Sequence, residues 1–321
     1  MKQLKIGILG CANIAKNQFI PALLELQDKF EIVGVASRSG DKAQEFAALF
    51  GISPIVGYEE LLNIDLDVVY IPLPTGLHKK WVNLFLAKGV HVYAEKSLAF
   101  STYDVEEMVE NARKSNVALM EGYTFLYHPQ HSLVKQLIQE GEIGEIRSFD
   151  SNFGFPPLLN TNFRYQAEIG GGVLFDACGY TLKSAFYFLG ETVELKASSL
   201  NFNKDFQTET IGSAFLAKNG VSAHLTFGFD NFYQCNYVIW GSKGKITVNK
   251  AFTPRAHQET VVLIEKDSEI REINIPPANQ FVLALIEFYN IVFDFDKRQS
   301  HYSDMLRVSK TIDQIITMKD K

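Results

Sequence analysis

Apolar runs alternate with helical stretches of about a dozen residues in the opening 120 residues of this chain. Leu4–Leu9 is a continuous apolar run closed by Gly10, as expected of a parallel strand that is buried on both faces. Further apolar runs at 31–36, 68–71, 90–93 and 117–120 are separated by helical patterns at 14–26, 42–50, 78–88 and 102–115. This alternation predicts βαβ units and a doubly wound parallel sheet.

The pattern changes after about Gly122. A helix at 130–140, a strand from Ile146 and a helix after Gly179 are followed by strands with no helices between them, at 193–203, 209–217, 221–229, 234–240, 245–249 and 260–265. Short polar turns join these strands, which predicts an antiparallel meander. Two helical stretches at 279–294 and 303–318 end the chain.

We therefore expect an α/β protein of two domains. Residues 1–122 form a Rossmann doubly wound parallel sheet, and residues 123–321 form an α+β domain that is built on a large, mostly antiparallel open sheet. The length of 321 residues suits two domains. The first domain is expected to bind a cofactor, and the second to bind substrate and to oligomerise.

A glycine-containing turn follows the first strand and opens the first helix. Against the pattern GxGxxG, Gly10 takes the first position, Ala12 the second and Ala15 the third. A helix N-terminus at this place presents N–H groups to the pyrophosphate of a dinucleotide. The pattern alone also fits an ordinary strand–turn–helix, but its position at the start of a βαβ unit favours cofactor binding by Gly10, Ala12, Asn13 and Ile14.

The second strand ends in Ser37 and Arg38, where an NAD-selective enzyme usually carries an acidic residue for the ribose 2′-OH. A guanidinium and a hydroxyl suit a 2′-phosphate instead. The sequence therefore predicts NADP(H) as the preferred cofactor, with NAD(H) possible. The alternative is a surface arginine that caps a turn.

Three residues offer proton-transfer chemistry. Glu95 and Lys96 follow a strand, so Lys96 lies at a carboxyl end of the sheet, where its charge favours an alkoxide-like transition state. Asp176 and Tyr180 are four residues apart at the start of a helix and share one face. A phenol exchanges a proton at neutral pH only if its pKa falls well below about 10, and Lys96 is the candidate for lowering it. The alternatives are a surface lysine, an N-terminal helix charge and a half-buried core aromatic.

These segments together resemble the glucose-fructose oxidoreductase/inositol dehydrogenase (Gfo/Idh/MocA) family of NAD(P)-dependent sugar oxidoreductases. The resemblance implies that Lys96, Asp176 and Tyr180 are catalytic. The family motif at Glu95 is Glu-Lys-Pro, and Ser97 replaces the proline here. The isomer of the Lys96–Ser97 peptide bond is left open, because a non-proline cis bond costs about 3 kcal/mol. Tyr180 replaces the histidine of most members, as in the subgroup with deoxysugar 3-ketoreductases and dimeric dihydrodiol dehydrogenases.

The resemblance extends to further segments. Residues 71–78 resemble a family loop Thr-Pro-x-x-x-His, which implies cofactor contacts from Leu73, Thr75 and His78. The Glu-Lys-Pro motif likewise implies a cofactor contact from Glu95. The alternative for His78 is a packing residue at a helix start. Near the domain junction, Tyr123, His128 and Gln130 could bind a sugar through aromatic and hydrogen-bonding contacts. Arg164 could bring a cation to the nicotinamide amide or to a substrate phosphate.

The expected activity is hydride transfer between a nicotinamide cofactor and a sugar-type carbonyl or hydroxyl, first of all reduction of a ketosugar that could be nucleotide-linked. The alternative is a dehydrogenase of a vicinal diol or aldopyranose, resembling dihydrodiol or xylose dehydrogenases. A non-catalytic NADP-sensing regulator is disfavoured, because a sensor has no need of the Lys–Asp–Tyr set.

Composition limits the partners. The formal net charge of −6, with no basic stripe, argues against nucleic acid. The three scattered cysteines fit a reducing cytoplasm, no spacing suggests a metal site, and no apolar window suggests a membrane span. Alternating apolar residues in 222–229 and 237–240 suggest an exposed sheet face, and hence a homodimer or homotetramer through the C-terminal sheet. Alternatively, the helices at 279–318 cover that face.

Overall fold

The computed structural model describes residues 2–190, 193–206 and 208–318, and the chain divides into two compact units. Unit 1 comprises Met1–Tyr123 and Phe281–Ser309, and unit 2 comprises Thr124–Gln280 and Lys310–Lys321. The division expected at residue 122 placed 281–309 in the second domain, whereas these residues pack with unit 1.

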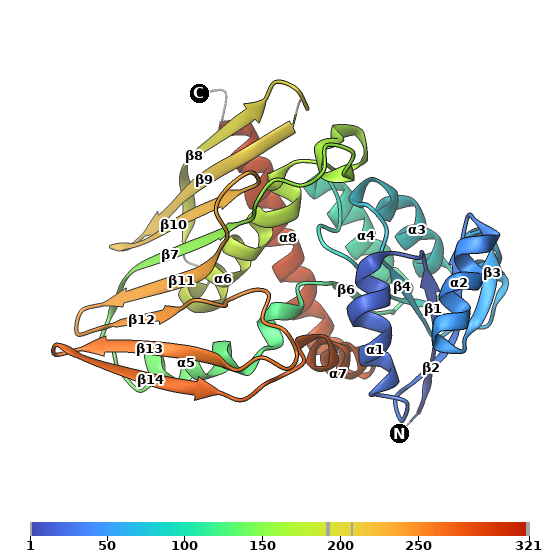
Figure 1. Ribbon diagram of the computed structural model, residues 1–321, viewed down its shortest axis with the longest axis horizontal. Coiled ribbons are helices and arrows are strands. Elements are labelled where there is room, and N and C mark those ends of the chain that lie inside the picture. Colours follow the sequence, from blue (N-terminus) through green and yellow to red (C-terminus); the bar gives the residue numbers. More distant parts are fainter. Residues whose placement is uncertain (1, 191–192, 207, 319–321) are drawn as a thin grey trace. The chain divides into compact units, whose positions relative to one another are not determined.

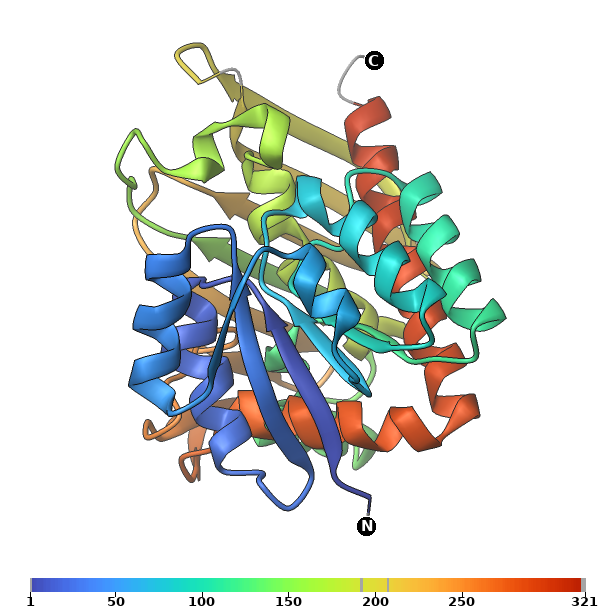
Figure 2. The same cartoon turned by 90° about the vertical axis from the view of Figure 1, so that its right-hand side faces the viewer.

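Unit 1 is built on a six-stranded parallel sheet with the order β3-β2-β1-β4-β5-β6. Its strands are β1 (Leu4–Leu9), β2 (Phe30–Ser37), β3 (Ser53–Val56), β4 (Val68–Ile71), β5 (His91–Ala94) and β6 (Leu119–Glu121). This is the Rossmann order, with the switch point beside β1. Figure 2 shows β1 and β2, in blue, side by side near the centre of the view. The predicted doubly wound sheet is confirmed.

Up to residue 114 the helices of unit 1 alternate with its strands as predicted, and two more come from the end of the chain. They are a π-helical turn (Ala15–Phe19) with α1 (Ile20–Leu24), then α2 (Gly40–Phe50), α3 (Thr75–Ala87), α4 (Thr102–Lys114) and α7 (Gln280–Phe293), with the first part of α8 (Phe295–Met318). Polar residues start two of them: the hydroxyls of Ser39 and Ser101 accept the N–H groups of Lys42 and Asp104. Gly51, with φ +67°, ends α2.

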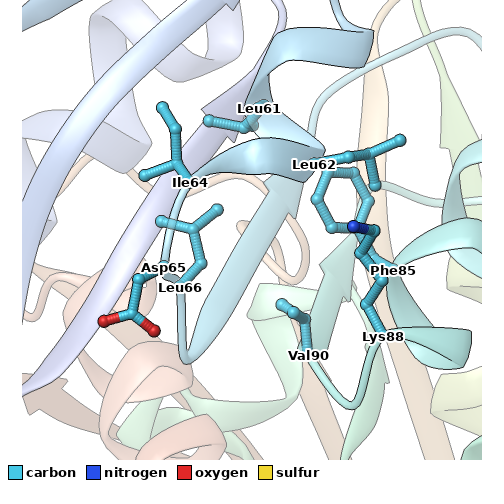
Figure 3. Close-up of a pocket in the computed structure, with 8 residues that line it drawn as sticks. All are labelled: Leu61, Leu62, Ile64, Asp65, Leu66, Phe85, Lys88 and Val90. Atoms are coloured by element: carbon cyan, nitrogen blue, oxygen red, sulfur yellow. The ribbon is translucent and has the colours of Figure 1, made fainter.

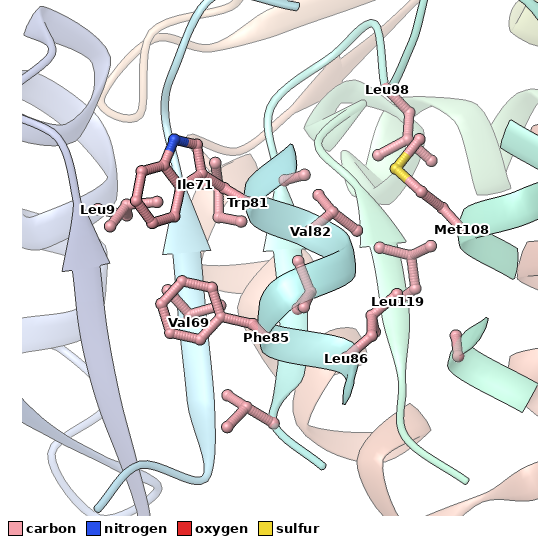
Figure 4. Packing of buried hydrophobic residues seen from close by; sticks show 14 of the residues in the cluster. Leu9, Val69, Ile71, Trp81, Val82, Phe85, Leu86, Leu98, Met108 and Leu119 are labelled. Atoms are coloured by element: carbon pink, nitrogen blue, oxygen red, sulfur yellow. The ribbon is translucent and has the colours of Figure 1, made fainter. Parts of the chain in front are cut away.

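Apolar side chains of α3 form the centre of the unit 1 core. Trp81, Val82, Phe85 and Leu86 lie toward the strands and are almost fully buried, and Figure 4 shows them against residues such as Val69 and Leu119. Residues from α8 join the same cluster, among them Tyr302 and Met305. Burial of such side chains contributes about 1.5–3 kcal/mol each, and this explains why 281–309 belongs to unit 1.

Polar contacts also tie the last two helices to unit 1. The Arg298 guanidinium donates to the carbonyl oxygens of Ile291, Val292 and Asn116, and so satisfies the end of α7. The Tyr302 hydroxyl donates to the Val117 carbonyl at 2.6 Å.

Unit 2 contains an eight-stranded sheet with the order β14-β13-β12-β11-β7-β10-β9-β8. Its elements are α5 (Pro129–Gln139), β7 (Ile146–Gly154), a π-helical turn (Leu174–Cys178) with α6 (Gly179–Leu189), β8 (Glu194–Asn203), β9 (Thr208–Lys218), β10 (Val221–Gly228), β11 (Gln234–Gly241), β12 (Lys245–Val248), β13 (Thr260–Lys266) and β14 (Glu269–Ile275). The large, mostly antiparallel sheet is confirmed, but the uninterrupted meander is wrong. β7 lies between β10 and β11 and pairs with β10 in parallel.

Three elements differ from the prediction. β3 was missed because it is a four-residue edge strand that contains Pro54, a residue usually avoided inside strands. β14, a mostly exposed edge strand with alternating charges, was also missed. α8 begins at Phe295 rather than residue 303, because the Asp294 carboxylate accepts the Lys297 N–H and starts the helix in a charged segment.

The expected exposed apolar face of the unit 2 sheet is wrong for the residues that suggested it. The alternating residues Ala223, Leu225, Phe227, Tyr237 and Ile239 are buried, and α5 and α6 pack on this side of the sheet (Figure 1). Neighbouring residues on the opposite side include Trp240, which is 60% exposed. Among the described residues, no helix is both long and apolar enough to cross a bilayer.

Candidate active site

The loops at the carboxyl ends of three neighbouring strands carry most of the predicted cofactor residues. Gly10 follows β1, Leu73 and Thr75 follow β4, and Glu95 follows β5. In open α/β sheets, ligands bind at this edge, near the point where the strand order reverses. Most of the cofactor residues predicted within unit 1 therefore lie at the expected edge of its sheet.

Gly10 allows the first two of these loops to approach each other. Its φ is +133°, and a Cβ at this position would lie 2.9 Å from Leu73 Cδ2. A larger residue would therefore both strain the turn and displace Leu73. Ala12 and Ile14 are partly exposed and Asn13 is exposed. They lie at the start of the first helix, whose first N–H groups have no partner within the helix. This arrangement fits a dinucleotide pyrophosphate.

The end of β2 fits a phosphate rather than a ribose hydroxyl. The Ser37 hydroxyl accepts the Ser39 N–H at 3.2 Å, and Ser39 in turn begins α2. Arg38 is exposed, with its Cζ atom 6.0 Å from the centre of the Tyr58 ring. A cation, a hydroxyl and a helix N-terminus therefore follow one another within four residues.

The segment that contains Lys96 is held on both sides of the lysine. The Tyr70 hydroxyl donates to Glu95 Oε1 at 2.8 Å, and the Tyr70 ring stacks on Phe19 at 3.4 Å. Burial, together with Glu95, raises the pKa of Tyr70 well above its usual value, so the phenol keeps its proton. Tyr70 was not predicted as a site residue. Its only signal in the sequence is a hydroxyl within a fully buried strand.

After Lys96 the peptide bond to Ser97 is cis. The Ser97 hydroxyl lies 3.3 Å from the Tyr123 hydroxyl, and the Leu98 N–H donates to Glu121 Oε1 at 2.9 Å. Tyr123, which was predicted to bind substrate, is buried and contacts this segment. His78, predicted to bind cofactor, is also buried in unit 1.

In unit 2, Asp176 forms an ion pair with Arg164. The Arg164 Nε atom is 2.7 Å from Asp176 Oδ2, and both side chains are mostly buried. Burial lowers the pKa of Arg164, but the Asp176 carboxylate outweighs it and the pKa is raised, so the cation is kept. Arg164 was predicted to contact the cofactor, and this pair gives it a role in orienting Asp176 that was not predicted.

Tyr180 is fixed by aromatic neighbours. Its ring lies 4.8 Å from Phe153, 5.5 Å from Phe125 and 5.6 Å from Phe252, measured between ring centres. The ring is partly exposed and four residues after Asp176, as the helical spacing predicted. Such tilted ring contacts restrict where the phenol oxygen can lie.

Glu209 supports the helix start that carries Asp176. Its buried carboxylate accepts the Leu174 N–H at 3.2 Å, and a Cβ on Gly172 would collide with the same carboxylate. Gly172 also has a φ of +108°. Glu209 was not predicted as a site residue, and its signal in the sequence was a carboxylate within the predicted strand 209–217.

His128 and Gln130 lie inside unit 2. The Gln130 amide donates to the carbonyls of Lys250 and Ala251, and His128 caps α5 by accepting the Gln130 N–H at 3.4 Å. His128 Nε2 is buried with no hydrogen-bond partner among the described residues. Their expected role in sugar binding stays a prediction.

A pocket of about 280 Å³ lies at the opposite, amino end of β4 and β5. It is lined by Leu61, Leu62, Ile64, Asp65, Leu66, Phe85, Lys88 and Val90 (Figure 3). None of these residues was predicted as a site residue, and the pocket is separate from the loops that hold the candidate site.

Similarity to known proteins identifies the family. Residues 4–123 match the oxidoreductase family with an NAD-binding Rossmann fold, and residues 131–247 match the GFO/IDH/MocA C-terminal domain. The chain belongs to the Gfo/Idh/MocA family. It is an oxidoreductase, and its unit 1 is an NAD(P)-binding Rossmann domain.

Several relatives reduce deoxysugars. The chain is 39% identical to a dTDP-3,4-didehydro-2,6-dideoxy-alpha-D-glucose 3-reductase of Saccharopolyspora spinosa, over 89% of this chain and 87% of the relative. The crystal structure of the 3-ketoreductase KijD10 from Actinomadura kijaniata, with NADP and TDP-benzene, matches with a TM-score of 0.95 and 37% identity, over 99% and 98% of the two chains. A D-xylose 1-dehydrogenase (NADP(+)) of Haloferax volcanii is 29% identical over 96% of this chain and 95% of the relative.

The buried histidine of the α5 cap predicts a loss of stability in acid. Burial lowers the pKa of His128 from 6.5 to about 4, so the unfolded chain binds a proton between these values that the folded chain does not. The stabilisation is therefore complete above pH 6.5 and is lost as the pH falls toward 4. His128→Asn keeps a capping side chain but removes the titration. Urea unfolding measures the free energy of unfolding at pH 7 and at pH 4.5. Between these two pH values, the free energy of unfolding should fall by about 2–3 kcal/mol less in the variant than in the wild type. An equal fall in both proteins would contradict the assignment.

Proposed function

We propose that this enzyme reduces the 3-keto group of a nucleotide-linked deoxysugar with NADPH. The observation that carries the proposal is the likeness to the 3-ketoreductase KijD10 over 99% of the chain, together with 39% identity to a dTDP-sugar 3-reductase. Both named relatives act on or bind thymidine-diphosphate compounds. We further propose that unit 1 binds the cofactor and that unit 2 supplies the substrate contacts.

Bound NADPH supplies the hydride that adds to the carbonyl carbon. Tyr180 donates the proton that the carbonyl oxygen needs to become a hydroxyl, and its ring is held for this by three phenylalanines. Lys96 stabilises the negative charge that develops on that oxygen. Asp176, held by Arg164, orients the substrate by accepting hydrogen bonds. KijD10 has been crystallised as a variant with a lysine replaced by alanine and as a variant with a tyrosine replaced by phenylalanine. Lysine and tyrosine are also the residue types of Lys96 and Tyr180.

A second candidate is oxidation of an aldopyranose or vicinal diol. It is favoured by the likeness to the xylose dehydrogenase, and by 33% identity to a trans-1,2-dihydrobenzene-1,2-diol dehydrogenase of Xenopus laevis over 59% of this chain. NADPH oxidation with a freshly generated dTDP-3-keto-deoxysugar, compared with NADP reduction on D-xylose and on a trans-diol, separates the two. Turnover of xylose alone would overturn the reductase proposal.

Loss of the Tyr180 hydroxyl should slow the chemical step. Tyr180→Phe is expected to lower kcat by about 10²–10⁴, because a general acid is lost while the ring contacts remain. Steady-state kinetics with the ketosugar and NADPH binding by fluorescence measure the two effects. Affinity for NADPH should be unchanged. A variant with wild-type kcat would remove Tyr180 from the mechanism.

The end of β2 predicts cofactor preference. Arg38→Ala should raise KM for NADPH about 10- to 100-fold, the effect of losing one charge-assisted hydrogen bond. KM for NADH should be nearly unchanged, because NADH has no 2′-phosphate. Lys42→Ala, one turn along α2, serves as a control for general loss of positive charge. Equal weakening of both cofactors in Arg38→Ala would contradict the assignment.

We also propose a homodimer or homotetramer, formed through the side of the unit 2 sheet that bears Trp240 and Ile211, which are 60% and 37% exposed. The reducing cytoplasm is the proposed compartment. Light scattering should give a mass of at least twice 36.2 kDa at micromolar concentration, and Trp240→Glu should lower it. A monomeric wild type would exclude this interface without affecting the chemistry.

A further inference from the structure

His78 lies between two loops of the candidate cofactor edge. It is in the first turn of α3 and has no exposed surface. Its Nδ1 atom is 3.0 Å from the Ser97 carbonyl oxygen and 3.2 Å from the Leu98 carbonyl oxygen, which follow Lys96. Its Nε2 atom is 2.7 Å from the Leu73 carbonyl oxygen, in the loop that packs on Gly10. One imidazole thus contacts both the lysine segment and the cofactor loop.

The protonation state of the His78 ring limits which carbonyl oxygens it can hydrogen-bond. Carbonyl oxygens only accept hydrogen bonds, and a neutral imidazole donates through one nitrogen. Burial lowers the pKa of His78 although the three carbonyls oppose it, which favours the neutral ring. An Nδ1–H satisfies two buried carbonyls and an Nε2–H only one, so the Nδ1–H form leaves fewer of them unpaired. This form leaves the Leu73 carbonyl beside a nitrogen lone pair.

We infer that His78 is a positioning residue for Lys96: it donates from Nδ1 to the Ser97 and Leu98 carbonyls and fixes the backbone from which the lysine side chain extends. The inference rests on the proposed function, in which Lys96 stabilises the substrate oxygen. The residue before Lys96 is fixed independently by Tyr70, and Ser97 also meets Tyr123. With His78 in place, the lysine is anchored on both of its sides.

Two amide variants, each of which replaces one ring nitrogen of His78, separate this role from simple packing. The side-chain amide of His78→Asn reaches the position of Nδ1, and that of His78→Gln reaches the position of Nε2. Asn should therefore keep the lysine segment in place, and kcat should stay within about threefold of wild type. Gln offers its donor to the Leu73 carbonyl and none to the lysine segment, so kcat should fall about 10²-fold, as expected for a misplacement of about 1 Å. KM for NADPH should change little in either variant, because the Nδ1–H ring of the wild type donates no hydrogen bond to the Leu73 carbonyl.

A double-mutant cycle tests whether the effect passes through the lysine. In a Lys96→Ala background, His78→Gln should lower kcat no further. A full additional loss in that background would overturn the inference, as would wild-type kcat in His78→Gln. Equal losses of kcat in the Asn and Gln variants, matched by equal falls in Tm, would reduce His78 to a packing residue.

The wild-type enzyme provides a measurement that needs no variant and no substrate. Nitrogen chemical shifts of the His78 ring show which nitrogen carries the proton; Nδ1–H is expected, and Nε2–H would overturn the inference. Hydrogen exchange at the Leu98 amide should quicken in His78→Gln and not in His78→Asn. Both readouts stand even if no ketosugar is reduced, so failure of the proposed substrate is distinguished from failure of the positioning role.

Discussion

Backbone groups that leave the carboxyl edge of the parallel sheet must find hydrogen-bond partners outside the strand ladder, since buried groups without partners cost about 1–3 kcal/mol each. In unit 1, His78 and Glu121 meet this need for the backbone of Ser97 and Leu98, and two tyrosines hold side chains of the same segment. Tyr70, His78, Glu121 and Tyr123 each contact residues 95–98. The same contacts that stabilise an irregular segment hold the candidate lysine in one place, so stability and function depend on the same hydrogen bonds.

In unit 2, buried carboxylates hold an irregular helix start in place. Asp176 and Glu209 are carboxylates on or beside the same helix start, and both are largely removed from water. Isolated buried charges are costly, but each has a specific partner here: Asp176 has the Arg164 guanidinium and Glu209 has the Leu174 N–H. These contacts are local to the helix that carries Tyr180. They order the helix start before any ligand is bound, which lowers the entropy that binding must overcome.

The sequence predicted those features whose cause is local. Alternating runs specified the parallel sheet, and the glycine turn and the Ser37–Arg38 pair were found at the strand ends where they were expected. Partners far apart in the chain could not be predicted, because no periodicity links Tyr70 to Glu95 or Leu174 to Glu209. The face of a strand that helices cover was also misjudged, since alternation in β10 and β11 indicates that one side is apolar but not what packs on it. Short edge strands such as β3 carry too few residues for any pattern.

The assembly of unit 1 from two separate stretches has a consequence for its synthesis. The chain emerges from the ribosome N-terminus first, and about 160 residues of unit 2 are made between the two stretches of unit 1. Until Arg298 and Tyr302 have been made, the carbonyls of Asn116 and Val117 lack their side-chain donors, and the apolar cluster around α3 lacks its α8 residues. The first 123 residues therefore emerge as an incomplete folding unit. The nascent enzyme therefore needs α8 before the core of unit 1 is complete.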